Sequence, residues 1–100
     1  IDIVARYGGD EFCIIMPETD SEMAEKFMTR LQRDIAGRKF EVEAVGTISC
    51  TVSLGGAVYP DNGDDRDKLI YAADMALLKA KEAGRNLALL AATEENSNRS

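Results

Sequence analysis

Two adjacent glycines between extended apolar runs, Gly8 and Gly9, constrain the fold more than any other feature of the chain. A two-residue turn of the primed type needs a positive φ at both central positions, so the pair predicts a β-hairpin. Two carboxylates, Asp10 and Glu11, follow directly. A turn without side-chain bulk lets a polyanion approach the backbone, and adjacent carboxylates can hold the Mg²⁺ that a polyanion carries. On the residues alone, two interpretations stand: a metal–nucleotide site, or an ordinary hairpin with solvated acids.

Charge and composition narrow the classes of function. A chain of 100 residues forms one domain at most. Its net charge of −6 disfavours nonspecific binding to nucleic acid or to an anionic membrane surface. It has no histidine, which excludes Ser-His and Cys-His catalysis and makes zinc a poor fit. Oxygen ligands and a hard cation remain, so we expect Mg²⁺, with Mn²⁺ as the alternative.

The cysteines and the chain ends bear on the compartment. Cys13 and Cys50 lie in apolar runs without Cys-x-x-Cys spacing, which predicts reduced core residues and a cytoplasmic protein. No run reaches the roughly 18 apolar residues of a membrane span, and no signal peptide is recognised. The first residue, Ile1, lies inside a strand-like run. We therefore expect a piece of a longer parent, which another segment could tether to a membrane.

Hydrophobic periodicity predicts two strands and a helix in the first part of the chain. Strands are expected over residues 1–7 and 11–17, and the second is apolar enough to be covered on both faces. Thr19, followed three residues later by Glu22, predicts a capping box at the start of a helix that ends near Gly37.

The second part is predicted to contain a short edge strand within 38–47, a long strand over 48–59, a helix and a last strand. The helix should begin near residue 65 or 67, bury one apolar stripe and end at Gly84. The glycines at 55 and 56 indicate either close approach by another backbone or a bulge. The last strand is expected over 86–90, and residues 93–100 should form a polar, disordered tail after a domain at 1–92.

Several sequence blocks resemble one known family. Residues 6–12, Arg-Tyr-Gly-Gly-Asp-Glu-Phe, are similar to the motif that names the GGDEF domains, the diguanylate cyclases. Three later blocks resemble the same family in order and spacing: Thr-Val-Ser-Leu-Gly at 51–55, Ala-Asp-Met-Ala-Leu at 73–77 and Ala-Lys-Glu-Ala-Gly-Arg-Asn at 80–86. The resemblance covers most of residues 2–90.

The resemblance implies an α+β fold with a mostly antiparallel central sheet flanked by helices, similar to adenylyl cyclase catalytic domains. In the family, one strand and two helices precede the hairpin, so this chain would be the C-terminal portion of the domain. A missing central strand would leave apolar surface uncovered on residues 12–16 and 48–54, and we expect self-association from it.

The family's chemistry implies a role for each site residue. It joins two GTP molecules into cyclic di-GMP and releases two pyrophosphates. By resemblance, Asp10 and Glu11 are the metal-binding and catalytic carboxylates, and Gly8 and Gly9 leave room for the nucleotide. Lys81 and Arg85 would bind the β and γ phosphates, although surface cations at a helix C-terminus are also common. The residue at 78 is Leu where the family usually has Tyr.

Some of the family's features have no counterpart in this sequence. A second metal aspartate and the residues that recognise guanine come from segments before the hairpin. Asp2 matches the acid of the product-inhibition motif, but the matching arginine would precede Ile1.

We therefore expect a diguanylate cyclase fragment, inactive alone, whose parent works as a homodimer under a sensor or regulatory domain. The alternative is a non-catalytic module that binds GTP or cyclic di-GMP for regulation. Neither hypothesis includes nucleic acid or membrane contact by this segment.

Overall fold

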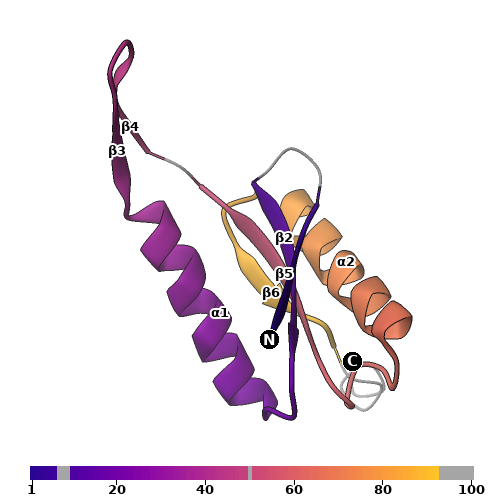
Figure 1. Cartoon of the computed structure of the whole chain (residues 1–100). Helices are drawn as coiled ribbons and strands as arrows, with labels where there is room; N and C mark the ends of the chain where they lie inside the picture. The colour runs from indigo at the N-terminus through magenta and orange to yellow at the C-terminus, as the bar shows by residue number, and fades with distance from the viewer. Residues whose placement is uncertain (7–9, 50, 93–100) are drawn as a thin grey trace.

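The computed structural model describes residues 1–6, 10–49 and 51–92. Two helices flank a sheet, and a separate hairpin projects beyond the end of the first helix (Figure 1). In chain order the elements are β1 (Asp2–Ala5), β2 (Glu11–Met16), α1 (Ser21–Ala36), β3 (Lys39–Val42), β4 (Gly46–Ser49), β5 (Ser53–Val58), α2 (Arg66–Glu82) and β6 (Ala88–Leu90). The predicted tail at 93–100 lies outside the described residues, and no helix in the described part has the length and apolarity needed to cross a bilayer.

The sheet is mixed, so the expectation of a mostly antiparallel sheet is wrong. Its strand order is β1-β2-β5-β6. β1 pairs antiparallel with β2, whereas the β2–β5 and β5–β6 pairs are parallel. The reason lies in the connections: helices follow β2 and β5, and a strand that returns after a crossover helix runs parallel to the first.

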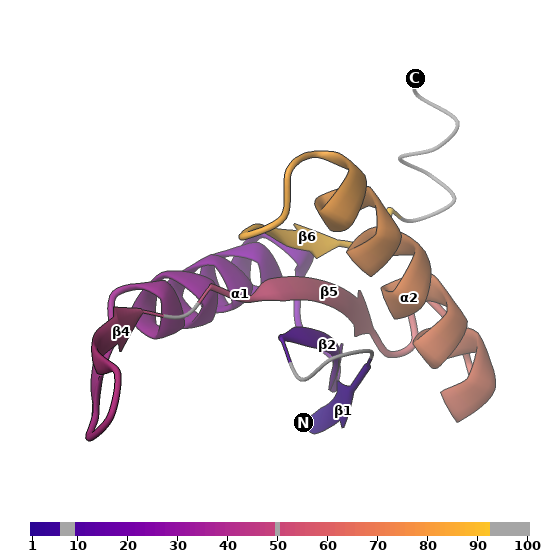
Figure 2. The same ribbon diagram turned by 90° about the horizontal axis from the view of Figure 1, so that it is seen from above.

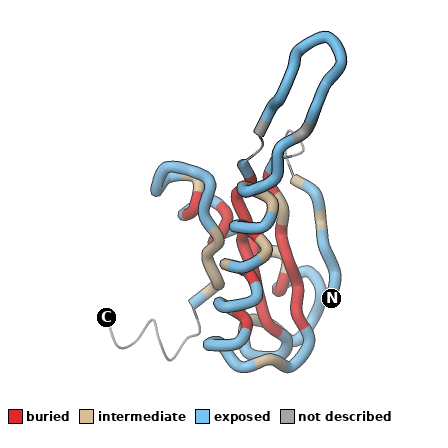
Figure 3. The backbone as a smooth tube through the Cα atoms, turned by 90° about the vertical axis from the view of Figure 1, so that its left-hand side faces the viewer, coloured by how far each residue is buried: buried red, intermediate tan, exposed pale blue. Residues whose placement is uncertain are grey.

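The two helices cover opposite faces of the sheet (Figure 2). Alternate residues of β2 enter two different clusters, as the pleat requires. Ile14 packs with Met28 of α1, whereas Cys13 packs with Ala73 of α2. The predicted two-sided burial of this strand is confirmed, and β2 and β5 carry most of the buried positions (Figure 3). The expectation of an uncovered surface is therefore wrong for residues 12–16 and 52–54, because the chain's own helices cover them, whereas Ile48 in β4 is 37% exposed. Self-association stays a prediction.

The glycines at 55 and 56 fit close packing rather than a bulge. The parallel register runs without a gap through Cys13↔Gly55 and Ile14↔Gly56. A Cβ atom at Gly55 would lie 2.2 Å from the carbonyl oxygen of Ala73 in α2. A Cβ atom at Gly56 would lie 2.2 Å from the sulfur of Met28 in α1. Each glycine therefore lets one helix approach the middle of the sheet.

Helix α1 begins one residue later than the capping-box prediction requires. Asp20 is the N-cap, and its carboxylate accepts a 2.9 Å hydrogen bond from the backbone N–H of Met23. The Thr19 hydroxyl instead donates to the carbonyl of Pro17. Thr19 and Asp20 can both cap a helix, and Asp, which ranks above Thr as an N-cap, takes the position. The predicted end at Gly37 is confirmed.

The strand predicted over 48–59 is wrong, because the structure has two strands there. β4 pairs antiparallel with β3, as Phe40↔Ile48 shows, and this hairpin forms a sheet of its own (Figure 1). β5 begins only at Ser53. Alternation of apolar and polar residues marked both segments as extended, but it could not show that their partners differ.

Helix α2 agrees with its predicted pattern. Asp65 is the N-cap and accepts from the backbone N–H of Lys68. The predicted apolar stripe is buried along the whole helix: Leu69, Ala73, Ala76, Leu77 and Ala80. The C-cap is Ala83, and Gly84 follows with a φ of 118°. The helix therefore stops where the chain enters a left-handed conformation that glycine adopts freely.

Candidate nucleotide and metal site

The site begins at the neck of the β1–β2 hairpin. The backbone N–H of Arg6 donates to the carbonyl of Glu11 at 2.7 Å, and Ala5 lies opposite Phe12. The predicted glycine turn at Gly8 and Gly9 lies outside the described residues, so the room it would leave for a nucleotide stays a prediction. Glu11 is the first residue of β2, and Asp10 directly precedes it.

Glu11 is the centre of a cluster of three charges. Its side chain is 6% exposed, and Lys81 Nζ and Arg85 Nη1 lie 3.2 Å and 2.9 Å from its two carboxylate oxygens. Hydrogen bonding from Arg85 and Lys81 lowers the pKa of Glu11, although desolvation opposes the shift. The structure thus brings together three of the predicted site residues. In the sequence, Glu11 lies 70 positions from Lys81 and 74 positions from Arg85.

The loop after α2 carries Arg85 to this cluster. Arg85 and Asn86 have φ values of 64° and 55°, which non-glycine residues seldom adopt. Each such residue costs on the order of 1–3 kcal/mol, so other contacts must hold it. The N–H of Asn86 donates to the Ser53 hydroxyl at 3.1 Å, and the side-chain amide of Gln32 donates to the Asn86 carbonyl at 3.1 Å.

Gln32 and Ser53 fix this loop, and neither was predicted as a site residue from the sequence. Gln32 is buried although it lies on a helix whose other buried positions are Ala24 and Met28. A polar residue at a buried position of an amphipathic helix needs a hydrogen-bond partner. The periodicity of residues 24–35 places Gln32 on the buried face, but it does not indicate that Asn86 is the hydrogen-bond partner.

Asp10 differs from its neighbour in being exposed. Its backbone carbonyl accepts a 3.0 Å hydrogen bond from the N–H of Ser53, so β5 fixes the main chain while the residue faces solvent. Carboxylate oxygens suit Mg²⁺ or Mn²⁺. Within residues 1–6, 10–49 and 51–92, however, no three acidic, cysteine or histidine side chains are placed to hold a metal ion together. Asp10 and Glu11 can supply only part of a coordination shell.

A second ionic contact joins the hairpin to the same helix. Asp74 of α2 accepts from Arg6 Nη2 at 2.9 Å and from the Cys13 thiol at 3.1 Å. Burial and the adjacent Asp74 carboxylate raise the pKa of Cys13 to about 12, so the thiol stays protonated and can donate. Cys13 is free and buried as predicted, whereas Cys50 lies outside the described residues. A pocket of about 260 Å³ between the two ionic contacts is lined by Arg6, Glu11, Asp74, Met75, Leu78 and Lys81.

Asp2, the residue matched to a product-inhibition motif, lies elsewhere. It is exposed and pairs with Ile15 near the end of β2, whereas Glu11 begins that strand. Four residues of extended chain span roughly 13 Å. Asp2 is therefore not part of the Glu11 cluster, and its role in product binding stays a prediction.

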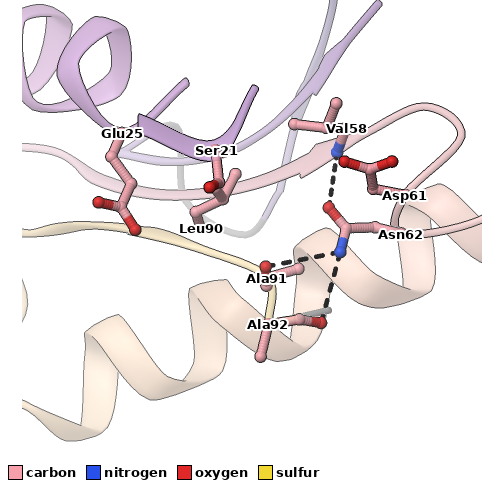
Figure 4. A pocket seen from close by; sticks show the side chains of 8 residues that line it. All are labelled: Ser21, Glu25, Val58, Asp61, Asn62, Leu90, Ala91 and Ala92. Atoms are coloured by element: carbon pink, nitrogen blue, oxygen red, sulfur yellow. Dashed lines mark hydrogen bonds between the residues drawn. The ribbon is translucent and has the colours of Figure 1, made fainter. Parts of the chain in front are cut away.

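Another pocket, of about 180 Å³, lies at the opposite end of β5 (Figure 4). Its polar centre is Asn62, whose side chain accepts from the N–H of Val58 at 2.8 Å and donates to the Ala91 carbonyl at 3.5 Å. The charged residues that line it, Glu25 and Asp61, are acidic. These charges would repel a polyphosphate. Asn62 therefore has a structural role, because its hydrogen bonds connect the ends of β5 and β6.

The lowered pKa of Glu11 predicts how stability responds to acid. A carboxyl whose pKa is lower in the folded state adds stability above its unfolded pKa, and that stability is lost as the pH falls through the folded value. Glu11→Gln should therefore destabilise the chain at pH 7, and its difference from the wild type should shrink below about pH 4.5. Urea unfolding across this range measures the difference.

Asp64→Asn is the matched control, because Asp64 pairs with Lys68 at the same distance as Glu11 with Arg85 but on an exposed surface. High salt should abolish the effect of the control and leave much of the Glu11 effect. A Glu11→Gln difference that grows as the pH falls would contradict the assignment.

Comparison with known proteins gives the family. The family model described as "Diguanylate cyclase, GGDEF domain" matches residues 1–87. The chain is 34% identical over 87 residues to the response regulator PleD of Caulobacter vibrioides, covering 86% of this chain and 19% of that protein. It is 34% identical over 85 residues to the diguanylate cyclase DgcP of Pseudomonas aeruginosa, covering 85% and 12%. It is also 33% identical over 91 residues to the cyclic di-GMP phosphodiesterase NbdA of the same species, covering 85% and 11%.

The chain thus spans less than a fifth of the length of these three relatives. The matched region includes the hairpin, α2 and the loop that carries Arg85. The chain belongs to the diguanylate cyclase GGDEF domain family.

Proposed function

We propose that this chain contributes the C-terminal portion of a diguanylate cyclase catalytic domain, which condenses two GTP into cyclic di-GMP and two pyrophosphates. The observation that carries the proposal is the convergence of Lys81 and Arg85 on Glu11 beside the glycine hairpin. The two cations in this corner can bind the phosphates of a nucleotide, and the two adjacent carboxylates can bind the metal ion that accompanies those phosphates.

The residues divide between phosphate binding and metal binding. Lys81 and Arg85 are held on Glu11 in this structure and would transfer to the β and γ phosphates when GTP binds. Glu11 would then be free to join Asp10 as a ligand of Mg²⁺, with Mn²⁺ as the alternative. A bound divalent cation neutralises phosphate charge and favours deprotonation of a nearby hydroxyl. Other ligands must complete the shell, because Asp10 and Glu11 offer only part of it.

The reaction is an in-line displacement at the α-phosphorus of GTP. The 3′ oxygen of one GTP forms a bond to the α-phosphorus of the other, the bond from that phosphorus to the bridging α–β oxygen breaks, and pyrophosphate leaves. Asp10, exposed beside the turn, would accept the hydroxyl proton. A second displacement, in which the two nucleotides exchange roles, closes the ring and releases the second pyrophosphate.

A homodimer follows from the chemistry, because each bond joins two nucleotides and the described residues form one such corner. Activity per mole of the complete protein should fall steeply on dilution below the dimer dissociation constant. Cyclic di-GMP formed from GTP and Mg²⁺ can be quantified by chromatography at a series of protein concentrations, with sedimentation at the same concentrations. Constant activity per mole in a sample that sediments as a monomer would refute the dimer requirement.

The second candidate is a regulatory module that binds GTP or cyclic di-GMP without turnover. Two observations favour it: Glu11 already pairs with both cations, and the relative NbdA is named a cyclic di-GMP phosphodiesterase. Calorimetry with GTP measures binding, and a pyrophosphate assay of the same samples measures turnover. A regulatory module would bind the nucleotide without releasing pyrophosphate.

A further inference from the structure

We propose that Asp74 is a positioning residue that sets the catalytic hairpin against helix α2; the proposal rests on the function proposed above for that hairpin. The sequence predicts a structural role for this residue, and its contacts indicate which segments it holds. Its two carboxylate oxygens are both engaged, one by Arg6 after β1 and the other by Cys13 in β2. One helical side chain therefore contacts both arms of the hairpin.

The two ionic contacts of α2 lie on either side of the glycine turn. Arg6 precedes the turn and pairs with Asp74, whereas Glu11 follows it and pairs with Lys81. Asp74 and Lys81 are seven residues apart, so they lie on one face of the helix, about 10 Å apart along its axis. The helix thus holds both arms of the hairpin, and Asp10 lies in the segment between the two contacts.

The first strand of the hairpin is mostly exposed. β1 is at the edge of the sheet, and Ile3 in its middle is 59% exposed. Its backbone pairs with β2, and the half-buried Val4 packs against the apolar cluster beneath α2. The Arg6–Asp74 ion pair is about 30% exposed on each side and so is only partly screened by water. Its loss should let β1 and the neck of the hairpin shift without unfolding the core, because β2 stays paired with β5.

A displaced hairpin should impair the chemical step more than nucleotide binding. Asp10 follows the turn on the other arm of this neck, and its main chain is bonded to Ser53 while its side chain is exposed, so a shift at Arg6 would change the orientation of that side chain. Lys81 and Arg85 belong to α2 and its C-terminal loop. A shift of about 1 Å in a reacting group can cost up to about 100-fold in rate. For Asp74→Asn we expect kcat to fall about 10-fold while KM for GTP stays within about 2-fold.

Hydrogen exchange in the 100-residue chain gives a readout independent of activity. The Arg6 N–H closes the hairpin neck, and the Leu54 N–H, bonded to the Leu87 carbonyl at 2.8 Å, reports on the central sheet. Asp74→Asn should lower protection at Arg6 at least about 10-fold relative to Leu54. Asp64→Asn, which breaks the Lys68 pair at the start of the same helix, should leave this ratio unchanged.

Kinetics of the complete protein test the same contact. Arg6→Gln and Asp74→Asn act through one ion pair, so the double variant should lose little more kcat than either single variant. The proposal is overturned if Asp74→Asn lowers protection equally at Arg6 and Leu54, or leaves both unchanged. If the wild type makes no cyclic di-GMP, the proposed function fails, and the exchange ratio still decides whether Asp74 positions the hairpin.

Discussion

Replacing Asp10 by Asn should lower the turnover of GTP in the complete protein by about 10²–10³-fold while the fold stays intact. The substitution removes an anionic metal ligand and the proposed proton acceptor, and single electrostatic groups at reacting centres contribute about this much. The fold should tolerate it because the residue is exposed and its structural contact is made by the backbone carbonyl. Initial rates at saturating Mg²⁺, with thermal unfolding of the same samples, measure both parts.

Asp34→Asn is the matched control, since Asp34 is also exposed but lies on α1. It removes the same charge from the molecule and should leave the rate within about 2-fold, because surface charges far from the site are screened. Unchanged turnover in Asp10→Asn would show that this aspartate is only a hairpin residue.

Replacing Gly55 by Ala should destabilise the domain by more than about 3 kcal/mol, the upper end of ordinary overpacking. The new Cβ atom would meet backbone atoms of α2, the carbonyl oxygen of Ala73 at 2.2 Å and the N–H nitrogen of Leu77 at 2.4 Å. Backbone in the middle of a helix cannot move aside locally, so the helix itself must move off the sheet. Chemical denaturation of the chain measures the loss.

The neighbouring glycine provides the control. Gly56→Ala adds the same methyl group in the same strand, but it meets the flexible end of Met28. A methionine side chain can change rotamer, so this loss should be clearly smaller. Equal losses for the two variants would contradict the view that Gly55 sets the distance between α2 and β5.

The local elements could be predicted from the sequence because each depends on neighbouring residues. The stripe of α2 and the two-sided burial of β2 followed from periodicity alone. The pairing of strands could not be predicted in this way. The break between β4 and β5 and the parallel pairing of β2 with β5 depend on which strands meet after each connection. Asp20 and Thr19 likewise competed for one cap position, and local preference alone did not decide between them.

The candidate site was predicted as separate pieces. Motif resemblance identified Glu11, Lys81 and Arg85, but it assigned the acid to a metal and the cations to phosphates. Their mutual ion pairs depend on the left-handed backbone at Arg85, which no residue preference indicates in advance. The contacts of Asp74 join segments more than 60 residues apart, and periodicity does not report such distances.

The most direct test of the account is the product balance of the complete protein with GTP and Mg²⁺, compared with its Lys81→Gln/Arg85→Gln variant. Cyclic di-GMP is quantified by chromatography and pyrophosphate by a coupled assay. We expect two pyrophosphates for each cyclic di-GMP in the wild type, and loss of both products together in the variant. Wild-type protein that binds GTP yet releases neither product, or a variant that retains wild-type rates, would contradict it.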